Sequence, residues 1–235
     1  MNTNVEIIAY HGWGFDRTCW YPWKTLLLNK GFRFQLFDRG YFGNESNLTF
    51  NLPWQQRLEE LEIPSKRVIL IHSYGLHLCP IEHLQLSDLL IIFSSFREFH
   101  PELEPFRRRS KVVLDQMKQQ LNKTPEIVLN TFKAKCYHPQ LWQPIAHSAC
   151  NLDLLVQDLE HLGTSSVNIE LLQSLPKVII FHGVDDRIVS IEKGQELFET
   201  LEANSDYFEI KGAGHALPFT HLKACWSFID PFICE

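Results

Sequence analysis

The chain has 235 residues, of which 45% are hydrophobic and 21% charged, the composition of an ordinary globular protein with one sizeable core. Its formal net charge is −6, so it has no overall attraction for nucleic acid or for an anionic membrane surface, and we expect neither as a partner. The length fits one domain, or one domain that carries an insertion.

The cysteines give no sign of a metal site or of a disulfide framework. No two of the six stand at the spacing of metal ligands or of a redox pair, so we expect no metal and no cofactor. Residues 1–10 lack the basic start of a secretory signal, and no apolar run reaches the roughly 20 residues that span a bilayer. We therefore expect a cytoplasmic, monomeric protein with reduced thiols at Cys19, Cys79, Cys136, Cys150, Cys225 and Cys234.

Short apolar runs alternate with helix-length amphipathic segments along the chain. Continuous apolar runs such as 68–71 and 178–181 are typical of parallel strands that helices cover on both faces. The alternation predicts an α/β fold with a doubly wound, mostly parallel sheet. Strands are expected at 5–10, 33–37, 67–72, 89–93, 177–182 and 207–210, and helices at 19–29, 55–61, 76–84, 192–203 and 221–232.

One long segment interrupts this alternation. Residues 100–175 contain no convincing strand, and prolines separate three helical stretches at 106–121, 126–135 and 151–162. We interpret them as an all-helical insertion into a core made of residues 1–99 and 176–235. Insertions after parallel strands stand over the crevice where α/β proteins bind ligands, so a lid is expected, with a helical excursion away from the site as the alternative.

The strongest local signal surrounds Ser73. The apolar strand 68–71 leads through His72 into Ser73-Tyr74-Gly75, and a helical pattern follows at once. A serine on such a turn projects its hydroxyl above the sheet edge, close to the amides that open the helix. The usual pattern is G-x-S-x-G, and here Ile71 occupies the first glycine position. The alternative is a serine that only caps a helix.

Two further polar groups follow later strands. The run 178–181 leads to the acidic pair Asp185-Asp186, and the loop after the last expected strand carries His215 between glycine and alanine. Alone, each is equally explained as a turn residue. Together they give the chain order Ser, Asp, His, each at the carboxyl end of an expected strand. We therefore expect Ser73 to be a nucleophile, His215 its base and one of the two aspartates the group that orients the base.

A glycine-rich turn follows the first strand. In His11-Gly12-Trp13-Gly14 the glycines allow a backbone N–H to face the site. We assign the two donors of an oxyanion hole to the amides of Trp13 and Tyr74. A plain glycine turn is the alternative reading of these four residues.

Along almost its whole length the chain resembles the α/β-hydrolase superfamily, and within it the pimeloyl-[acyl-carrier protein] methyl ester esterases of biotin biosynthesis. The resemblance rests on the three motifs above and on Gly183-Val184-Asp185-Asp186 with Val189. Because the family pattern is G-x-x-D-x-x-V, it implies Asp186 rather than Asp185 as the acid of the triad. It also implies hydrolysis of a carrier-bound methyl ester without a cofactor.

The expected insertion carries the densest basic run of this acidic chain. Arg107, Arg108, Arg109 and Lys111 are the residues that we expect to dock an acyl carrier protein, the partner that the resemblance implies. A solvated helix face is the alternative. The side chains expected to contact the acyl group are Trp13, Tyr74, Phe96 and Phe132.

Two other functions remain open on the sequence. One is a general small-molecule carboxylesterase or thioesterase that uses the same three residues. The other is a non-catalytic binding protein with this fold, in which Ile71 distorts the turn that carries Ser73.

Overall fold

In the computed structural model, which describes residues 4–43, 65–144, 149–201 and 204–234, six strands form one sheet in the order β2-β1-β3-β4-β5-β6. Every neighbouring pair of these strands is parallel. The chain moves outward from β1 to β2, returns to β3 on the other side of β1, and continues outward to β6. The strands are β1 Asn4–Tyr10, β2 Arg33–Leu36, β3 Ser65–His72, β4 Leu89–Phe93, β5 Val178–Gly183 and β6 Ser205–Ile210.

Helices cover both faces of this sheet. Side chains alternate across a strand, so Val68 and Leu70 of β3 join the apolar cluster under α1 and α11, whereas Ile69 and Ile71 join the cluster on the opposite face. The sheet is therefore doubly wound, as the alternation in the sequence predicts. The helices outside the insertion are α1 Tyr21–Asn29, α3 Gly75–Leu78, α4 Ile81–Gln85, α9 Ile191–Leu201, α10 Leu217–Thr220 and α11 Leu222–Cys234, with a 3-10 turn at Arg17–Trp20.

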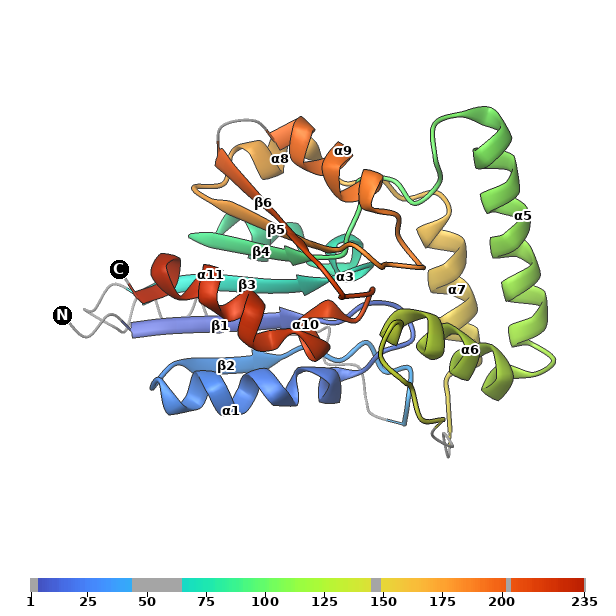
Figure 1. The fold of residues 1–235 in the computed structure, drawn as a ribbon, viewed down its shortest axis with the longest axis horizontal. Coiled ribbons are helices and arrows are strands. Elements are labelled where there is room, and N and C mark those ends of the chain that lie inside the picture. Colours follow the sequence, from blue (N-terminus) through green and yellow to red (C-terminus); the bar gives the residue numbers. More distant parts are fainter. Residues whose placement is uncertain (1–3, 44–64, 145–148, 202–203, 235) are drawn as a thin grey trace.

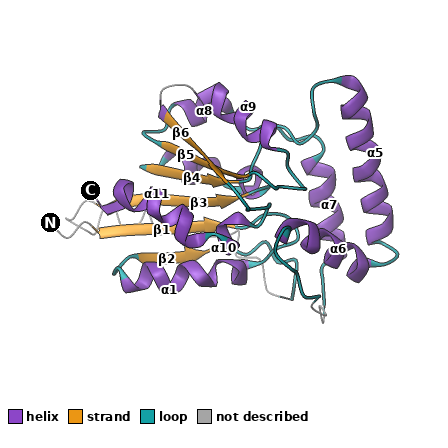
Figure 2. Ribbon diagram, viewed as in Figure 1, coloured by secondary structure: helices purple, strands orange, loops and turns teal. Residues whose placement is uncertain are grey.

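All helices of the expected insertion lie between β4 and β5. They are α5 Glu104–Leu121, α6 Pro125–Tyr137, α7 Leu152–Leu162 and α8 Ile169–Gln173. In Figure 1 and Figure 2 the strand arrowheads point toward α5, α6 and α7, which stand beyond the carboxyl ends of the strands. A proline occupies the first turn of α5 and of α6, where its missing N–H costs nothing.

The last helix of this segment, α8, differs from the other three. Its Leu172 is fully buried in the same cluster as Ile69 and Ile71 of the sheet, together with Leu197 and Leu201 of α9. The sequence did not predict α8, which has only five residues. The part of the insertion that stands over the sheet edge is therefore α5 to α7, and α8 belongs to the covering of the sheet.

The helix expected at 76–84 is two short helices, α3 and α4. Cys79 is extended, with φ −65° and ψ 125°, because the proline that follows it disfavours helical backbone at this position. Pro80 then has no N–H with which to continue the helix. The helix expected at 55–61 lies outside the described residues.

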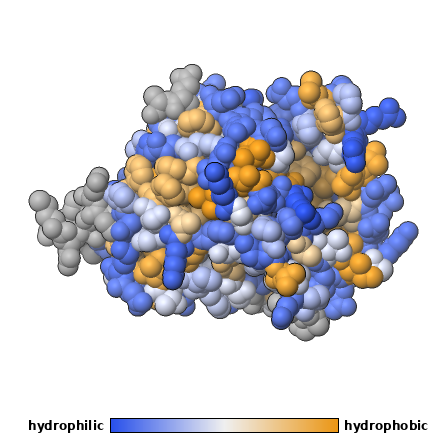
Figure 3. Space-filling view, in the orientation of Figure 1, coloured by the Kyte–Doolittle hydropathy of each residue, from blue (hydrophilic) through white to orange (hydrophobic). Residues whose placement is uncertain are grey.

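The face shown in Figure 3 is mostly hydrophilic. Hydrophobic residues gather on it in patches, some of them where α5 to α7 meet the rest of the molecule. None of the described helices combines the length and the apolar character needed to cross a membrane.

Candidate active site

The turn after β3 holds Ser73 in a conformation that few residues adopt. Ser73 has φ 55°, and its amide donates to the carbonyl of Phe93 at the end of β4 at 2.9 Å. A Cβ on Gly75 would lie 2.9 Å from the His11 carbonyl oxygen, so only glycine fits where this turn meets the loop after β1. The side chain of Ile71 is fully buried in a core cluster on one face of the sheet, so the turn forms without a glycine there.

Ser73, His215 and Asp186 form a continuous hydrogen-bonded chain. Nε2 of His215 lies 2.9 Å from Oγ of Ser73, and Nδ1 of the same ring lies 2.8 Å from Oδ2 of Asp186. The three residues follow β3, β6 and β5, so strands far apart in the sequence bring them to one edge of the sheet. This arrangement can move a proton from the hydroxyl to the imidazole while the carboxylate holds the ring in place.

The acidic pair after β5 divides into one buried and one exposed carboxyl group. The Asp186 carboxylate is fully buried and accepts from the amides of Ile188 and Val189 at 2.8 and 2.9 Å, whereas Asp185 is exposed. Burial by itself raises the pKa of Asp186, but the charge and hydrogen bond of His215 outweigh it, so the pKa is lowered. Asp186 is thus held as a carboxylate beside the ring.

A second histidine supports the same carboxylate. Nε2 of His182 lies 3.0 Å from the Val189 carbonyl oxygen and 3.5 Å from Oδ2 of Asp186. Burial lowers the pKa of His182, and the carboxylate of Asp186 opposes that shift only in part. Sequence reasoning did not select His182, because a histidine inside a strand has no local signature of this role.

The loop that carries His215 is packed between His72 and α6. Nε2 of His72 lies 3.0 Å from the His215 carbonyl oxygen. On the other side, the Ala216 amide donates to the Cys136 carbonyl at 2.8 Å, and a Cβ on Gly214 would overlap the backbone of His138. The end of α6 therefore fixes the backbone beside the base.

The two backbone amides expected to form an oxyanion hole lie on the loop after β1 and directly after Ser73. Among the described residues the amides of Trp13 and Tyr74 donate to no protein acceptor. A Cβ on Gly12 would lie 2.8 Å from the Cβ of Ser73, so the loop after β1 approaches the serine as closely as glycine permits. Two amides without a protein acceptor close to the serine turn are compatible with the oxyanion hole expected from the sequence, which stays a prediction.

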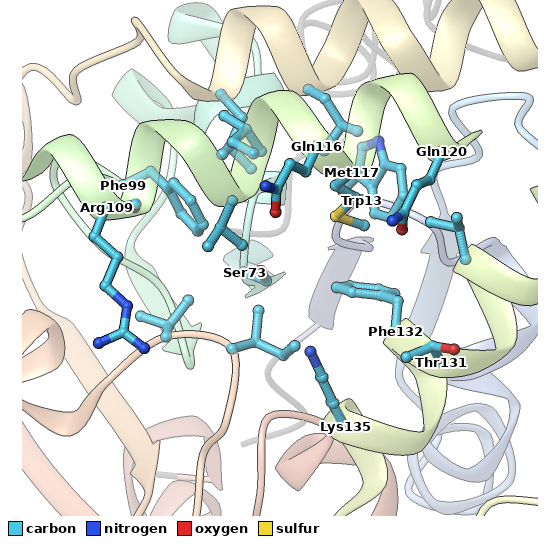
Figure 4. Close-up of a pocket in the computed structure, with 18 of the residues that line it drawn as sticks. Trp13, Ser73, Phe99, Arg109, Gln116, Met117, Gln120, Thr131, Phe132 and Lys135 are labelled. Carbon is cyan, nitrogen blue, oxygen red and sulfur yellow. The ribbon is translucent and has the colours of Figure 1, made fainter. Parts of the chain in front are cut away.

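A cavity of about 530 Å³ opens between the sheet edge and the insertion, a size typical of small-molecule sites. Ser73 lies among its lining residues, together with Trp13, Phe96 and Phe132 (Figure 4). Tyr74 is not among the residues that line this cavity, and its ring is fully buried, so a contact of its side chain with substrate stays a prediction. Most other lining side chains are apolar, among them Phe99, Val113, Leu114, Met117, Val128, Leu159, Leu162, Ile188 and Val189.

Helix α7 is tied to the loop after β2 by a buried ion pair. The Asp158 carboxylate accepts from Nε and Nη2 of Arg39, both at 2.8 Å, and from the Tyr41 hydroxyl at 2.5 Å. The hydrogen bond of Asp158 raises the pKa of the Arg39 guanidinium, and burial, followed by the charge of Asp158, raises the pKa of Tyr41. These hydrogen bonds thus cross the boundary between insertion and core.

A second contact joins α7 to the serine turn itself. The Tyr74 hydroxyl lies 2.6 Å from Nδ1 of His161, and Nε1 of Trp13 donates to the Leu155 carbonyl at 2.9 Å. The side chains of both residues that carry the unpaired amides are therefore held by α7. The sequence pointed to the two amides but not to this support.

The basic residues of the insertion separate into groups with different surroundings. Arg107, Arg108, Arg109 and Lys111 all lie on α5, and Arg109 also lines the cavity. Lys118 forms an ion pair with Asp115 at 2.9 Å. Lys133 is buried, with its ammonium 3.1 Å from the centre of the Phe15 ring, and burial lowers its pKa to about 8. Lys135 lines the cavity.

The described residues contain no group of three or more His, Cys, Asp or Glu side chains arranged to hold a metal ion.

No protein-family model and no curated protein sequence matches this chain. Solved structures do match it over its whole length. An esterase from Exiguobacterium antarcticum has a TM-score of 0.80 at 16% identity, and the match covers 100% of this chain and 94% of that one. A bromoperoxidase from Bacillus anthracis has a TM-score of 0.76 at 17% identity, covering 100% and 93%.

A structure of MenH from S. aureus matches with a TM-score of 0.71 at 15% identity, covering 100% of this chain and 95% of that one. These names differ in activity, and at such identities the likeness concerns the fold. With its parallel six-stranded sheet and helical insertion, the chain has the α/β-hydrolase fold.

Proposed function

We propose that this protein is a serine carboxylester hydrolase. The observation that carries the proposal is the hydrogen-bonded chain from Ser73 Oγ through the His215 ring to the Asp186 carboxylate. The chain ends at a serine that lines an apolar cavity, where an ester can approach the hydroxyl. A neutral hydroxyl is a poor nucleophile, and an adjacent imidazole is the group that activates it.

In the first half of the reaction, Ser73 Oγ attacks the ester carbonyl carbon while Nε2 of His215 takes the hydroxyl proton. The charge that develops on the carbonyl oxygen is stabilised by the amides of Trp13 and Tyr74, each such donor contributing roughly 3 to 4 kcal/mol. The C–O bond to the alcohol then breaks, and His215 returns the proton to the leaving oxygen. Asp186 stabilises the imidazolium throughout.

In the second half, water replaces the alcohol. His215 takes a proton from water, the hydroxide attacks the acyl-serine carbonyl, and the same two amides hold the oxyanion. Collapse of this intermediate releases the carboxylic acid and returns the proton to Ser73. One ester and one water give one acid and one alcohol, and no electrons are exchanged.

A fluorophosphonate probe tests the nucleophile directly. We expect the wild-type protein to be labelled and the Ser73→Ala variant to be unlabelled. An unlabelled wild-type protein would contradict the proposal and favour a non-catalytic binding protein with this fold. Because Ser73 is 94% removed from solvent in the present structure, a small alkyl probe should be used.

The substrate that we propose is the methyl ester of pimeloyl-acyl carrier protein, which would be cleaved to methanol and pimeloyl-acyl carrier protein in biotin biosynthesis. Two observations support it: the resemblance of the motifs around Ser73, Asp186 and His215, and the basic run on α5. Cations beside a site attract an acidic carrier domain through long-range electrostatics.

Carrier docking is tested by replacing Arg107, Arg108 and Arg109 together with Glu. We expect kcat/KM for the carrier-bound methyl ester to fall by about a hundredfold, since three charge contacts are reversed, and to fall far less for a small neutral ester. An equal loss for both substrates would show that α5 does not dock a carrier protein.

A general carboxylesterase or thioesterase is the second candidate. It is favoured by the largely apolar lining of the cavity, which suits many acyl groups. A panel of nitrophenyl esters and acyl thioesters distinguishes the two candidates. Hydrolysis of this panel as fast as that of the carrier-bound ester would favour the general enzyme.

A further inference from the structure

Two cationic side chains face the cavity from the two helices that form its outer wall. Arg109 of α5 and Lys135 of α6 belong to the lining, and both are exposed in the present structure. In Figure 4 they lie on different sides of the cavity as drawn, with Ser73 between them. Among the described residues neither cation has an ion-pair partner, and no Asp or Glu lines the cavity.

Helical spacing accounts for the polar face that these two residues share. On α6, Ile127, Thr131 and Lys135 follow one another at intervals of four, so they lie on one face of the helix and all three line the cavity. On α5, Arg109, Gln116 and Gln120 line it in the same way. The two outer helices therefore supply the charged and hydrogen-bonding side chains of the lining other than those of Ser73 and Trp13, among apolar neighbours such as Val113, whereas the floor around Ser73 is apolar.

The positive charge of Arg109 and Lys135 is opposite in sign to the net charge of the whole protein. The chain carries a net charge of −6, and two other cations of the insertion have different surroundings: Lys118 pairs with Asp115, and Lys133 is buried against Phe15. A cavity with unpaired positive charge and no acidic group has a positive potential, and its apolar walls strengthen it.

We infer that the cavity binds esters that carry an anionic group at the end remote from the scissile bond, and that Arg109 and Lys135 bind this group. The inference rests on the proposed function and deepens it, since it names the substrate class of the same site. The apolar floor takes the carbon chain, and the cations fix the far end. A carboxylate or a phosphate satisfies this chemistry, because both accept hydrogen bonds from guanidinium and ammonium groups.

The test compares two substrates of equal length. The monomethyl ester of heptanedioic acid carries a carboxylate at its far end, and the dimethyl ester is neutral there. We expect wild type to prefer the monomethyl ester in kcat/KM, measured as initial rates. In the Arg109→Gln/Lys135→Gln variant the ratio of the two kcat/KM values should fall by about tenfold, as expected for lost charge-assisted hydrogen bonds at partly solvated groups.

A matched control comes from the same insertion. Lys123 lies between α5 and α6, is exposed and does not line the cavity. The Lys123→Gln variant removes one positive charge from the insertion, so it should leave the substrate ratio within about twofold of wild type if only local contacts matter. A ratio that is the same in wild type, in the double variant and in this control, both for this pair and for the phosphate pair described next, would overturn the inference.

A second pair of substrates shows whether the anionic group bound by Arg109 and Lys135 is a phosphate or a carboxylate. The methyl ester of pimeloyl-phosphopantetheine, without carrier protein, has a phosphate at the far end, and its dephosphorylated form does not. Dependence on Arg109 and Lys135 for this pair alone assigns the cations to a phosphate, and dependence for the dicarboxylic pair alone assigns them to a carboxylate. Either result supports the anion site.

Binding without turnover separates this inference from the proposed function. Heptanedioate is titrated calorimetrically into the Ser73→Ala variant and into Ser73→Ala with Arg109→Gln and Lys135→Gln. We expect the dissociation constant to rise by about tenfold in the second protein. This result would support the anion site even if the protein hydrolysed no ester, whereas equal affinities would contradict carboxylate binding by Arg109 and Lys135 even if ester hydrolysis were demonstrated.

Discussion

The sheet edge and helix α7 hold their parts of the site by different kinds of contact. At the sheet edge the backbone does most of the positioning: Ser73 sits at φ 55°, and the Asp186 carboxylate is fixed by two amides of its own loop. On α7 the positioning comes from side chains, above all the buried carboxylate of Asp158 on Arg39. The two regions should therefore fail differently when single side chains are replaced.

The largest effect is expected at the sheet edge, from Asp186→Asn. An amide cannot stabilise the imidazolium of His215 and favours the wrong tautomer of the ring, so kcat should fall by about 10⁴-fold. The backbone amides of Ile188 and Val189 can still bond the remaining oxygen, so the fold should persist. Ester hydrolysis and circular dichroism of the same preparation measure the two effects.

Asp185→Asn is the matched control, because the neighbouring carboxyl group is exposed. Its kcat should stay within about twofold of wild type, as expected for a surface substitution away from the reacting atoms. If Asp185→Asn were the damaging change, the assignment of the acid to Asp186 would be wrong.

On α7 the largest effect is expected from Asp158→Asn. The change leaves the Arg39 guanidinium without its charge partner, and breaking a buried pair in this way costs about 3 to 5 kcal/mol. Because the Arg39 side chain remains 17% exposed, we expect the lower part of this range, a loss of about 3 to 4 kcal/mol in the free energy of unfolding. Urea denaturation measures it.

The comparison for this substitution is Asp153→Asn, on the exposed side of the first turn of α7. Only a weak interaction with the helix dipole is lost there, so the free energy of unfolding should change by less than about 1 kcal/mol. Equal losses for Asp153 and Asp158 would mean that the ion pair does not hold α7 to the core.

The difference between the two regions also explains what the sequence could predict. Ser73, Asp186 and His215 each stand where a strand pattern ends, and parallel strands bring such positions to one edge, so local patterns sufficed to bring them together. The pair of Asp158 and Arg39 joins positions 119 residues apart. Neither partner has a local signature, so no pattern in a single sequence identifies the contact.

Within the fold, the same reasoning separates the elements that were predicted from those that were not. The central strands, such as β3, β4 and β5, were recognisable because strands buried on both faces are continuous apolar runs, whereas the edge strands β2 and β6 have mixed sequences. Helix α8 was missed, since five residues are too few for a helical period to emerge. The helix predicted at 76–84 is divided at Cys79 because of Pro80. The prediction followed the hydrophobic pattern of this segment and did not take the proline into account.

A smaller effect is expected from pH, through His72 beside the base. Burial, followed by the charge of His215, lowers the pKa of His72 well below its usual 6.5. Below about pH 6.5 the unfolded chain therefore takes up a proton at this position that the folded protein does not, and His72 contributes about 1.4 kcal/mol per pH unit to the fall in the free energy of unfolding. The lowered pKa values of His77, His83, His100 and His182 act in the same direction. Denaturation at pH 7.0, 6.0 and 5.0 measures this slope.

His72→Gln should flatten that slope, because glutamine does not titrate and can still donate to the His215 carbonyl. His221→Gln, a change of a partly exposed ring, provides the comparison. If the slope of His72→Gln matched that of wild type between pH 7.0 and 5.0, the acid sensitivity would have to come from other groups.

The smallest effect is expected from His161→Phe, which removes a hydrogen bond between α7 and the serine turn at the sheet edge. The Tyr74 hydroxyl loses its partner on α7 in a partly buried setting, which should lower the free energy of unfolding by about 1 kcal/mol. Because the Tyr74 amide is a proposed oxyanion donor, kcat should also fall, by about two- to fivefold, with KM nearly constant. His161→Gln retains a hydrogen-bonding group and should recover most of kcat, a recovery that a merely space-filling role of His161 would not produce. If kcat were the same in His161→Phe and His161→Gln, the hydrogen bond from His161 would not position the serine turn, and α7 would only contribute to the shape of the cavity.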